Sequence, residues 1–173
     1  MYHPTPGQIG CTMKTLMVAL EQQKKLLEEL QSLLTRETNE LSDVHVEAMA
    51  DINIQKEELS SRMAAHAATL GNALCEAASR EGLSSKASLG ELAVKLAQKG
   101  NRDIAHAHVE LNAVADRIKE QLSLNREIAE RFAASVGSSL DFISRIINQT
   151  STYGASGSYQ QRSAGAVMIN REA

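Results

Sequence analysis

Aromatic residues are scarce in this chain of 173 residues, which has no tryptophan, three tyrosines and two phenylalanines. Globular cores and catalytic pockets usually contain more aromatic bulk, because aromatic side chains bury the largest areas. Proline is also rare, and its two copies both precede residue 7. Proline breaks helix interiors, and no proline after residue 6 interrupts a helix in the rest of the chain. The composition therefore favours long helices that pack through leucine, isoleucine and alanine.

Cysteine and targeting signals are equally sparse. Cys11 and Cys75 are too few for a disulfide framework, and we interpret them as reduced thiols. The N-terminus shows no basic region followed by an apolar run, and no stretch is long enough to span a bilayer. A formal charge of −3 does not suggest the basic stripe that nucleic acid requires. We expect a cytoplasmic protein with no nucleic-acid partner and no membrane insertion.

What the chain does have is a leucine-rich pattern with steps of three and four residues. The pattern runs from Met13 to Leu41, again from His45 to Ala77, and a third time from Ile104 to Ile147. This spacing places the apolar side chains on one stripe of a long helix, and such a stripe needs a partner. The sequence predicts an all-α fold, an elongated antiparallel bundle of three long helices with one short connecting helix.

The expected organisation has three parts: a flexible leader over residues 1–10, a helical domain over 11–149 and a mobile tail over 150–173. Thr12 is a plausible N-cap for the first helix. The polar run Thr38–Asp43 predicts a short turn or kink between the first two helices, although a continuous helix remains possible. Gly82 is expected to end the second helix in a left-handed conformation.

Residues 82–101 are expected to connect the second and third long helices. Ser88 and Glu91 have the spacing of a capping box, which predicts a short helix that begins there and ends at Gly100. Asn101 is suited to cap the third long helix.

The histidines are the first residues to test for catalysis or metal binding. His106 and Glu110 are four residues apart on one helix face, but a metal site needs three or four ligands and no second cluster is evident. There is no glycine-rich phosphate loop and no nucleophile motif. We therefore expect no catalytic residue, no metal and no cofactor, and we rank a metalloenzyme below the alternatives that follow.

Polar residues interrupt the apolar pattern at five positions: Gln23, Glu37, Lys56, His66 and Asn125. A polar residue in a helix seam commonly fixes the register of the pairing at a cost in stability. The alternative is a bundle that is open at those levels and accepts another helix.

The end of the third long helix carries the most hydrophobic segment of the chain. We call the following five residues the C-terminal stripe: Phe132, Val136, Leu140, Ile143 and Ile147. Phe142 and Ile146 lie beside it. One interpretation is ordinary core packing; the other is a surface that stays partly exposed until an amphipathic helix of a partner covers it.

The order of these features resembles the FlgN family of flagellar export chaperones over residues 13–158. The matching elements are Leu26-Leu27-x-x-Leu30, Leu33-Leu34, Glu37-x-x-x-Leu41-x-Asp43, Lys56-x-x-Leu59, Leu124-Asn125 and Tyr153-Gly154-x-x-Gly157. The resemblance implies a type III export chaperone that binds the C-terminal segments of the hook–filament junction proteins FlgK and FlgL. It assigns client binding to the C-terminal stripe and docking on the export apparatus to Tyr153, Gly154 and Gly157.

A second function is compatible with the same pattern. Leucine seams also build structural coiled coils, so the chain could be an oligomerising rod or a tether without a client. Tight self-association through the stripes would distinguish that protein from a chaperone.

Overall fold

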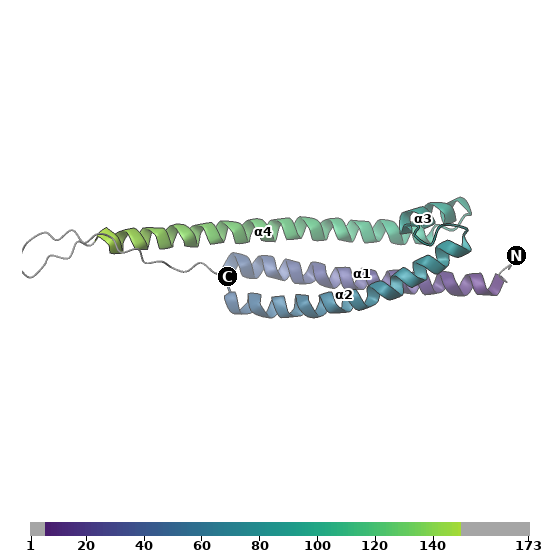
Figure 1. Ribbon diagram of the computed structural model, residues 1–173, viewed down its shortest axis with the longest axis horizontal. Coiled ribbons are helices and arrows are strands. Elements are labelled where there is room, and N and C mark those ends of the chain that lie inside the picture. The colour runs from purple at the N-terminus through teal and green to yellow at the C-terminus, as the bar shows by residue number, and fades with distance from the viewer. Residues whose placement is uncertain (1–5, 150–173) are drawn as a thin grey trace, which may run out of the picture. The chain divides into compact units, whose positions relative to one another are not determined.

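The computed structural model describes residues 6–149, which form helices and the short connections between them (Figure 1). The helices of this part are α1 (Pro6–Asp43), α2 (Val46–Arg80), α3 (Leu89–Gln98) and α4 (Asp103–Gln149). No strand occurs between residues 6 and 149, so the predicted all-α class is confirmed there. The expected tail lies outside the described residues.

The chain divides into two compact units, Met1–Ile128 and Ala129–Ala173. Helix α4 therefore contributes its first part to one unit and its second part to the other. We describe each unit by itself.

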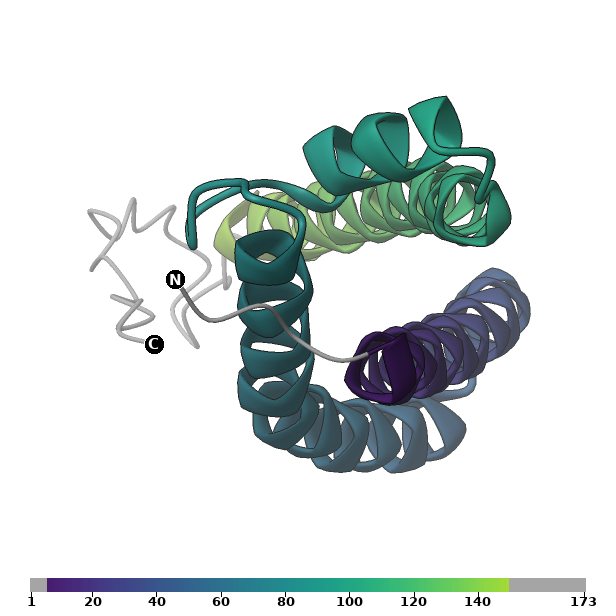
Figure 2. The same ribbon diagram turned by 90° about the vertical axis from the view of Figure 1, so that its right-hand side faces the viewer.

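In the first unit, the second half of α1 lies between α2 and the first part of α4, whereas the end of α2 crosses α1 and approaches α3 (Figures 1 and 2). Ion pairs from Glu29 to Arg62 and from Glu37 to Lys56, each 2.7 Å long, show that α1 and α2 are antiparallel. Lys24 pairs with Glu110 at 2.9 Å, and Thr38 bonds to Asn125 further along both helices, so α1 and α4 are parallel. These helix pairs alone do not establish the elongated antiparallel bundle of three helices that the sequence predicts, and that arrangement stays a prediction.

Two sets of leucines on α1 form the contacts with its neighbours. Leu26 and Leu33 pack with Leu59 of α2, whereas Leu34 packs with Val114 and Ile118 of α4. Consecutive residues of a helix point about 100° apart, so the Leu26–Leu27 and Leu33–Leu34 pairs give α1 two apolar faces. A third cluster, built around Leu16, Leu92 and Ile104, joins α1, α2, α3 and α4 at the other end of this unit.

Helix α1 differs from its prediction at both ends. It begins at Pro6, a residue whose fixed φ suits the first helical position, so the prediction of Thr12 as N-cap is wrong. The hydroxyl of Thr12 instead donates to Glu76 of α2 at 3.1 Å. The helix also continues through the polar run Thr38–Asp43, because Ser42 bonds back to the Thr38 carbonyl at 2.8 Å instead of capping a new helix.

The turn between α1 and α2 lies at Val44 and His45. Val44 has a φ of 58°, the left-handed region that usually holds glycine. The backbone N–H of His45 donates to the Glu40 carbonyl, and that of Val44 to the Leu41 carbonyl, the two bonds of a Schellman motif. A glycine at this position would have marked the turn in the sequence, but valine did not.

The helix ends predicted at Gly82, Ser88 and Gly100 are confirmed. Gly82 and Gly100 have φ of 69° and 87°. Each ends its helix with the same two backbone bonds that surround Val44. Ser88 and Glu91 form the expected capping box at the start of α3. The side-chain oxygen of Asn101 accepts from the Asp103 N–H at 3.1 Å, which supports its expected role at the start of α4.

Candidate functional site

The C-terminal stripe lies on the part of α4 that belongs to the second unit. Its five side chains are between 41% and 65% exposed. Phe142 and Ile146, which project about 120° and 80° away from Val136, are 65% and 49% exposed. Nothing in the described part of this unit buries these residues, so the structure does not support the core-packing interpretation.

The charged side chains of this segment lie on the other side of the same helix. At about 100° per residue, the C-terminal stripe stays within about 40° of the direction of Val136. The charged residues of the segment project roughly 120° or more from that direction; they are Glu130, Arg131, Asp141 and Arg145. The helix therefore presents an apolar face about 22 Å long, from Phe132 to Ile147, with no charged side chain on it.

An apolar face of this kind suits a particular class of partner. Exposed contiguous apolar patches usually mark protein–protein contacts, and an amphipathic helix can lay its own apolar face on such a surface.

The remaining predicted site residues are Tyr153, Gly154 and Gly157. They follow Gln149 and lie outside the described residues.

Three of the five polar seam residues, Glu37, Lys56 and Asn125, meet in one layer across three helices, whereas the ring of His66 lies 2.9 Å from the Ala19 carbonyl oxygen. We call Glu37, Thr38, Lys56, Gln121 and Asn125 the polar layer. Lys56 of α2 pairs with one carboxylate oxygen of Glu37 at 2.7 Å. The side-chain nitrogen of Asn125 donates to the other oxygen at 3.0 Å and to the Leu34 carbonyl at 2.9 Å. On the far side of Asn125, the Thr38 hydroxyl bonds to its side-chain oxygen and accepts from Gln121.

This layer decides between two interpretations of the polar seam residues. Asn125 is 5% exposed, and every buried side-chain nitrogen or oxygen in the described part of the chain has a partner. The polar groups of the layer bond to one another, so they are not left open to bind another helix. Register control is the role that this geometry supports for Glu37, Lys56 and Asn125.

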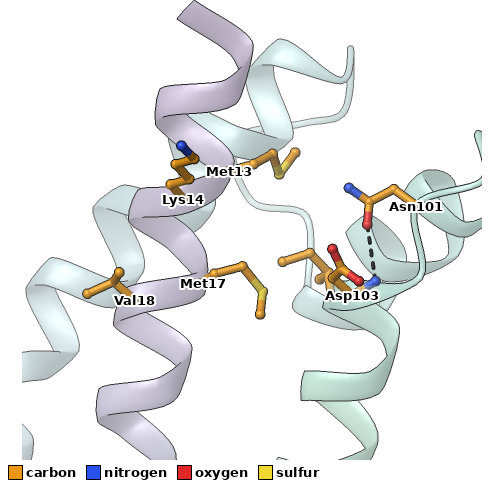
Figure 3. A pocket seen from close by; sticks show the side chains of 7 residues that line it. Met13, Lys14, Met17, Val18, Asn101 and Asp103 are labelled. Carbon is orange, nitrogen blue, oxygen red and sulfur yellow. Dashed lines mark hydrogen bonds between the residues drawn. The ribbon is translucent and has the colours of Figure 1, made fainter.

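A hollow that the sequence did not indicate lies between the start of α1 and the start of α4 (Figure 3). It measures about 370 Å³, and Met13 and Met17 point from α1 toward Asn101 and Asp103. A second hollow of about 520 Å³, on the side of α2, shares Lys14 and Val18 with the first. Val18, which lines both hollows, is 70% exposed.

The described histidines and acids do not gather into a metal site. No group of three His, Cys, Asp or Glu side chains within residues 6–149 is placed to hold an ion. Glu110, the expected partner of His106, is bound to Lys24, which lowers the pKa of the Glu110 carboxyl. None of the described helices is both long enough and apolar enough to cross a membrane.

The model of the family described as FlgN protein matches residues 12–161, which includes α2, α3, α4 and nearly all of α1. No curated protein and no solved structure matches the chain.

Proposed function

Because this chain belongs to the FlgN family of flagellar export chaperones, we propose that it binds the C-terminal segments of the hook–filament junction proteins FlgK and FlgL. In this proposal it keeps those segments from assembling early and delivers them to the export apparatus. The family is one of chaperones, and no catalytic step is part of the proposal.

The observation that carries the proposal is the exposure of the C-terminal stripe. Covering roughly 500 Å² of apolar surface would contribute on the order of 12 kcal/mol before the costs of association. A client segment that becomes ordered on binding loses conformational entropy, which offsets much of this gain. The complex is then reversible, as delivery requires.

Docking on the export apparatus is assigned to Tyr153, Gly154 and Gly157. The support for this assignment is family membership, because the FlgN match extends through these positions to residue 161. In this proposal the client surface and the docking element lie on consecutive segments of the chain.

The test is a calorimetric titration of the full chain with a peptide from the C-terminus of a FlgK-type protein. Leu140→Asp places a charge on the C-terminal stripe, whereas Ala134→Asp places the same charge on the opposite, exposed face of α4. We expect Leu140→Asp to weaken binding about tenfold or more and Ala134→Asp to change it less than about twofold. Equal effects of the two variants would contradict the assignment, as would the absence of binding by the unaltered chain.

The alternative is a structural coiled coil that self-associates through the same face. The spacing of the C-terminal stripe is compatible with it. Sedimentation of the full chain separates the two: a stable oligomer that neither dissociates nor binds the peptide would favour the structural role.

A further inference from the structure

The same chain contains a candidate occupant for the C-terminal stripe. Residues 150–173 follow α4, and near their end comes the apolar segment Ala166-Val167-Met168-Ile169. We propose that this segment covers the C-terminal stripe when no client is bound and competes with the client for it. The competition with a client rests on the proposed function, whereas the contact between this segment and the C-terminal stripe does not.

Chain length supports this occupant. Residues 150–166 are rich in glycine and serine, and a linker of that composition and length has a root-mean-square reach of roughly 21–25 Å. Helix α4 rises about 20 Å between Val136 and Gln149. The reach of the linker thus matches the distance to the middle of the C-terminal stripe.

Covalent attachment favours the chain's own segment over a second copy. When linker reach and span match, the effective concentration of a tethered segment is on the order of millimolar. A second molecule at micromolar concentration would need an affinity about a thousandfold higher to occupy the face equally.

The chemistry of the two surfaces also agrees. From Ser163 to Asn170 the segment has no charged residue, and the C-terminal stripe has none on its face. Met168 suits an irregular apolar surface, because its side chain is unbranched and adapts its shape. Arg162 and Arg171 flank the segment and remain in water when it packs.

Such a contact would act at two moments of delivery. A client must displace the segment before it binds, which lowers the apparent affinity and assists release. After release, the segment covers an apolar face that would otherwise promote aggregation.

Disulfide trapping in the full chain tests the contact directly. In a background with Cys11→Ser and Cys75→Ser, Met168→Cys is combined either with Ser139→Cys, beside the C-terminal stripe, or with Asp141→Cys, on the opposite face. After mild oxidation we expect the Ser139→Cys pair to form cross-linked monomer at least about fivefold more than the Asp141→Cys pair. This yield should not change over about a tenfold range of protein concentration. Equal yields of cross-linked monomer for the two pairs would overturn the contact. Cross-linked dimers would overturn it in favour of a second copy.

A binding measurement then tests the competition. The triple variant Val167→Ser, Met168→Ser and Ile169→Ser should bind the FlgK-type peptide about two- to tenfold more tightly than the unaltered chain. Unchanged affinity would overturn the competition. If neither the unaltered chain nor the variant binds the peptide while the selective cross-link forms, the proposed client is wrong and the contact stands. If the peptide binds but the selective cross-link does not form, the contact alone is rejected.

Discussion

Asn125 of α4 donates a hydrogen bond of 3.0 Å to the carboxylate of Glu37 of α1, which Lys56 of α2 holds from the other side. One carboxylate thus connects three helices at a single level. A shift of any helix by one residue would separate these partners and leave polar groups buried without hydrogen bonds, a cost of about 1–3 kcal/mol for each group.

The first prediction concerns Asn125. Asn125→Ala removes the donor to Glu37 and to the Leu34 carbonyl, and should lower the free energy of unfolding by about 1–3 kcal/mol in urea denaturation. Leu124→Ala, at a neighbouring residue that is 45% exposed, is the matched control and should cost less. A larger loss for Leu124→Ala would mean that the polar layer does not stabilise the pairing.

The second prediction compares two ion pairs between α1 and α2. Lys56 and Glu37 are 26% and 16% exposed, whereas Arg62 and Glu29 are 48% and 44% exposed. Lys56→Met should destabilise by about 1 kcal/mol or more because it leaves Glu37 partly buried without its cation. Arg62→Met should cost about 0–1 kcal/mol, since exposed pairs contribute little. Thermal denaturation of both variants measures the difference, and equal losses would contradict it.

The third prediction concerns the left-handed turn. Val44→Gly should stabilise the chain by about 1 kcal/mol, because glycine adopts a positive φ without the steric cost that valine bears there. Val46→Gly, in the first turn of α2, should instead destabilise by about 1 kcal/mol. Chemical denaturation distinguishes the opposite signs, and a loss of stability in Val44→Gly would show that the turn has another conformation.

The fourth prediction concerns the pKa of Glu91. The backbone N–H of Ser88 donates to its carboxylate at 2.7 Å and the Ser88 hydroxyl at 3.0 Å, and these bonds lower the pKa of Glu91 below 4.5. A lowered pKa in the folded state stabilises α3 above pH 4.5, and this contribution is lost as the pH falls through the folded-state pKa. Ser88→Ala removes only the hydroxyl, so the Glu91 pKa should rise part of the way in an NMR titration.

Glu110 provides the control for that titration. Its pKa is lowered by Lys24, so it should not respond to Ser88→Ala and should rise in Lys24→Met. A Glu91 pKa that stays unchanged in Ser88→Ala would contradict a contribution from the hydroxyl bond.

The fifth prediction concerns Tyr153 in the segment after α4. Tyr153→Ala should leave the melting temperature unchanged and impair secretion of the FlgK and FlgL clients, if its role is docking. Tyr159→Ala is a matched control that should secrete normally. Early melting of Tyr153→Ala would assign the tyrosine to the folded interior and reject the docking role.

Local sequence determined the features that depend on neighbouring residues. The Ser88–Glu91 capping box and the glycine caps at Gly82 and Gly100 are decided within one helical turn, where side chain and backbone meet regardless of the rest of the fold. The C-terminal stripe belongs to the same class, because helical periodicity alone places its five side chains on one face.

The tertiary structure decided what those faces meet. The sequence pattern placed Leu27 and Leu34 on one stripe of α1, but Leu26 and Leu33 are also buried because α1 packs between two helices. The pattern placed the polar residue Asn125 within an apolar stripe, yet only the packing of the helices showed that Glu37 and Lys56 lie at the same level. Periodicity likewise left open whether the C-terminal stripe is core or surface. Burial depends on which helices come together in space, and spacing along one helix carries no information about that.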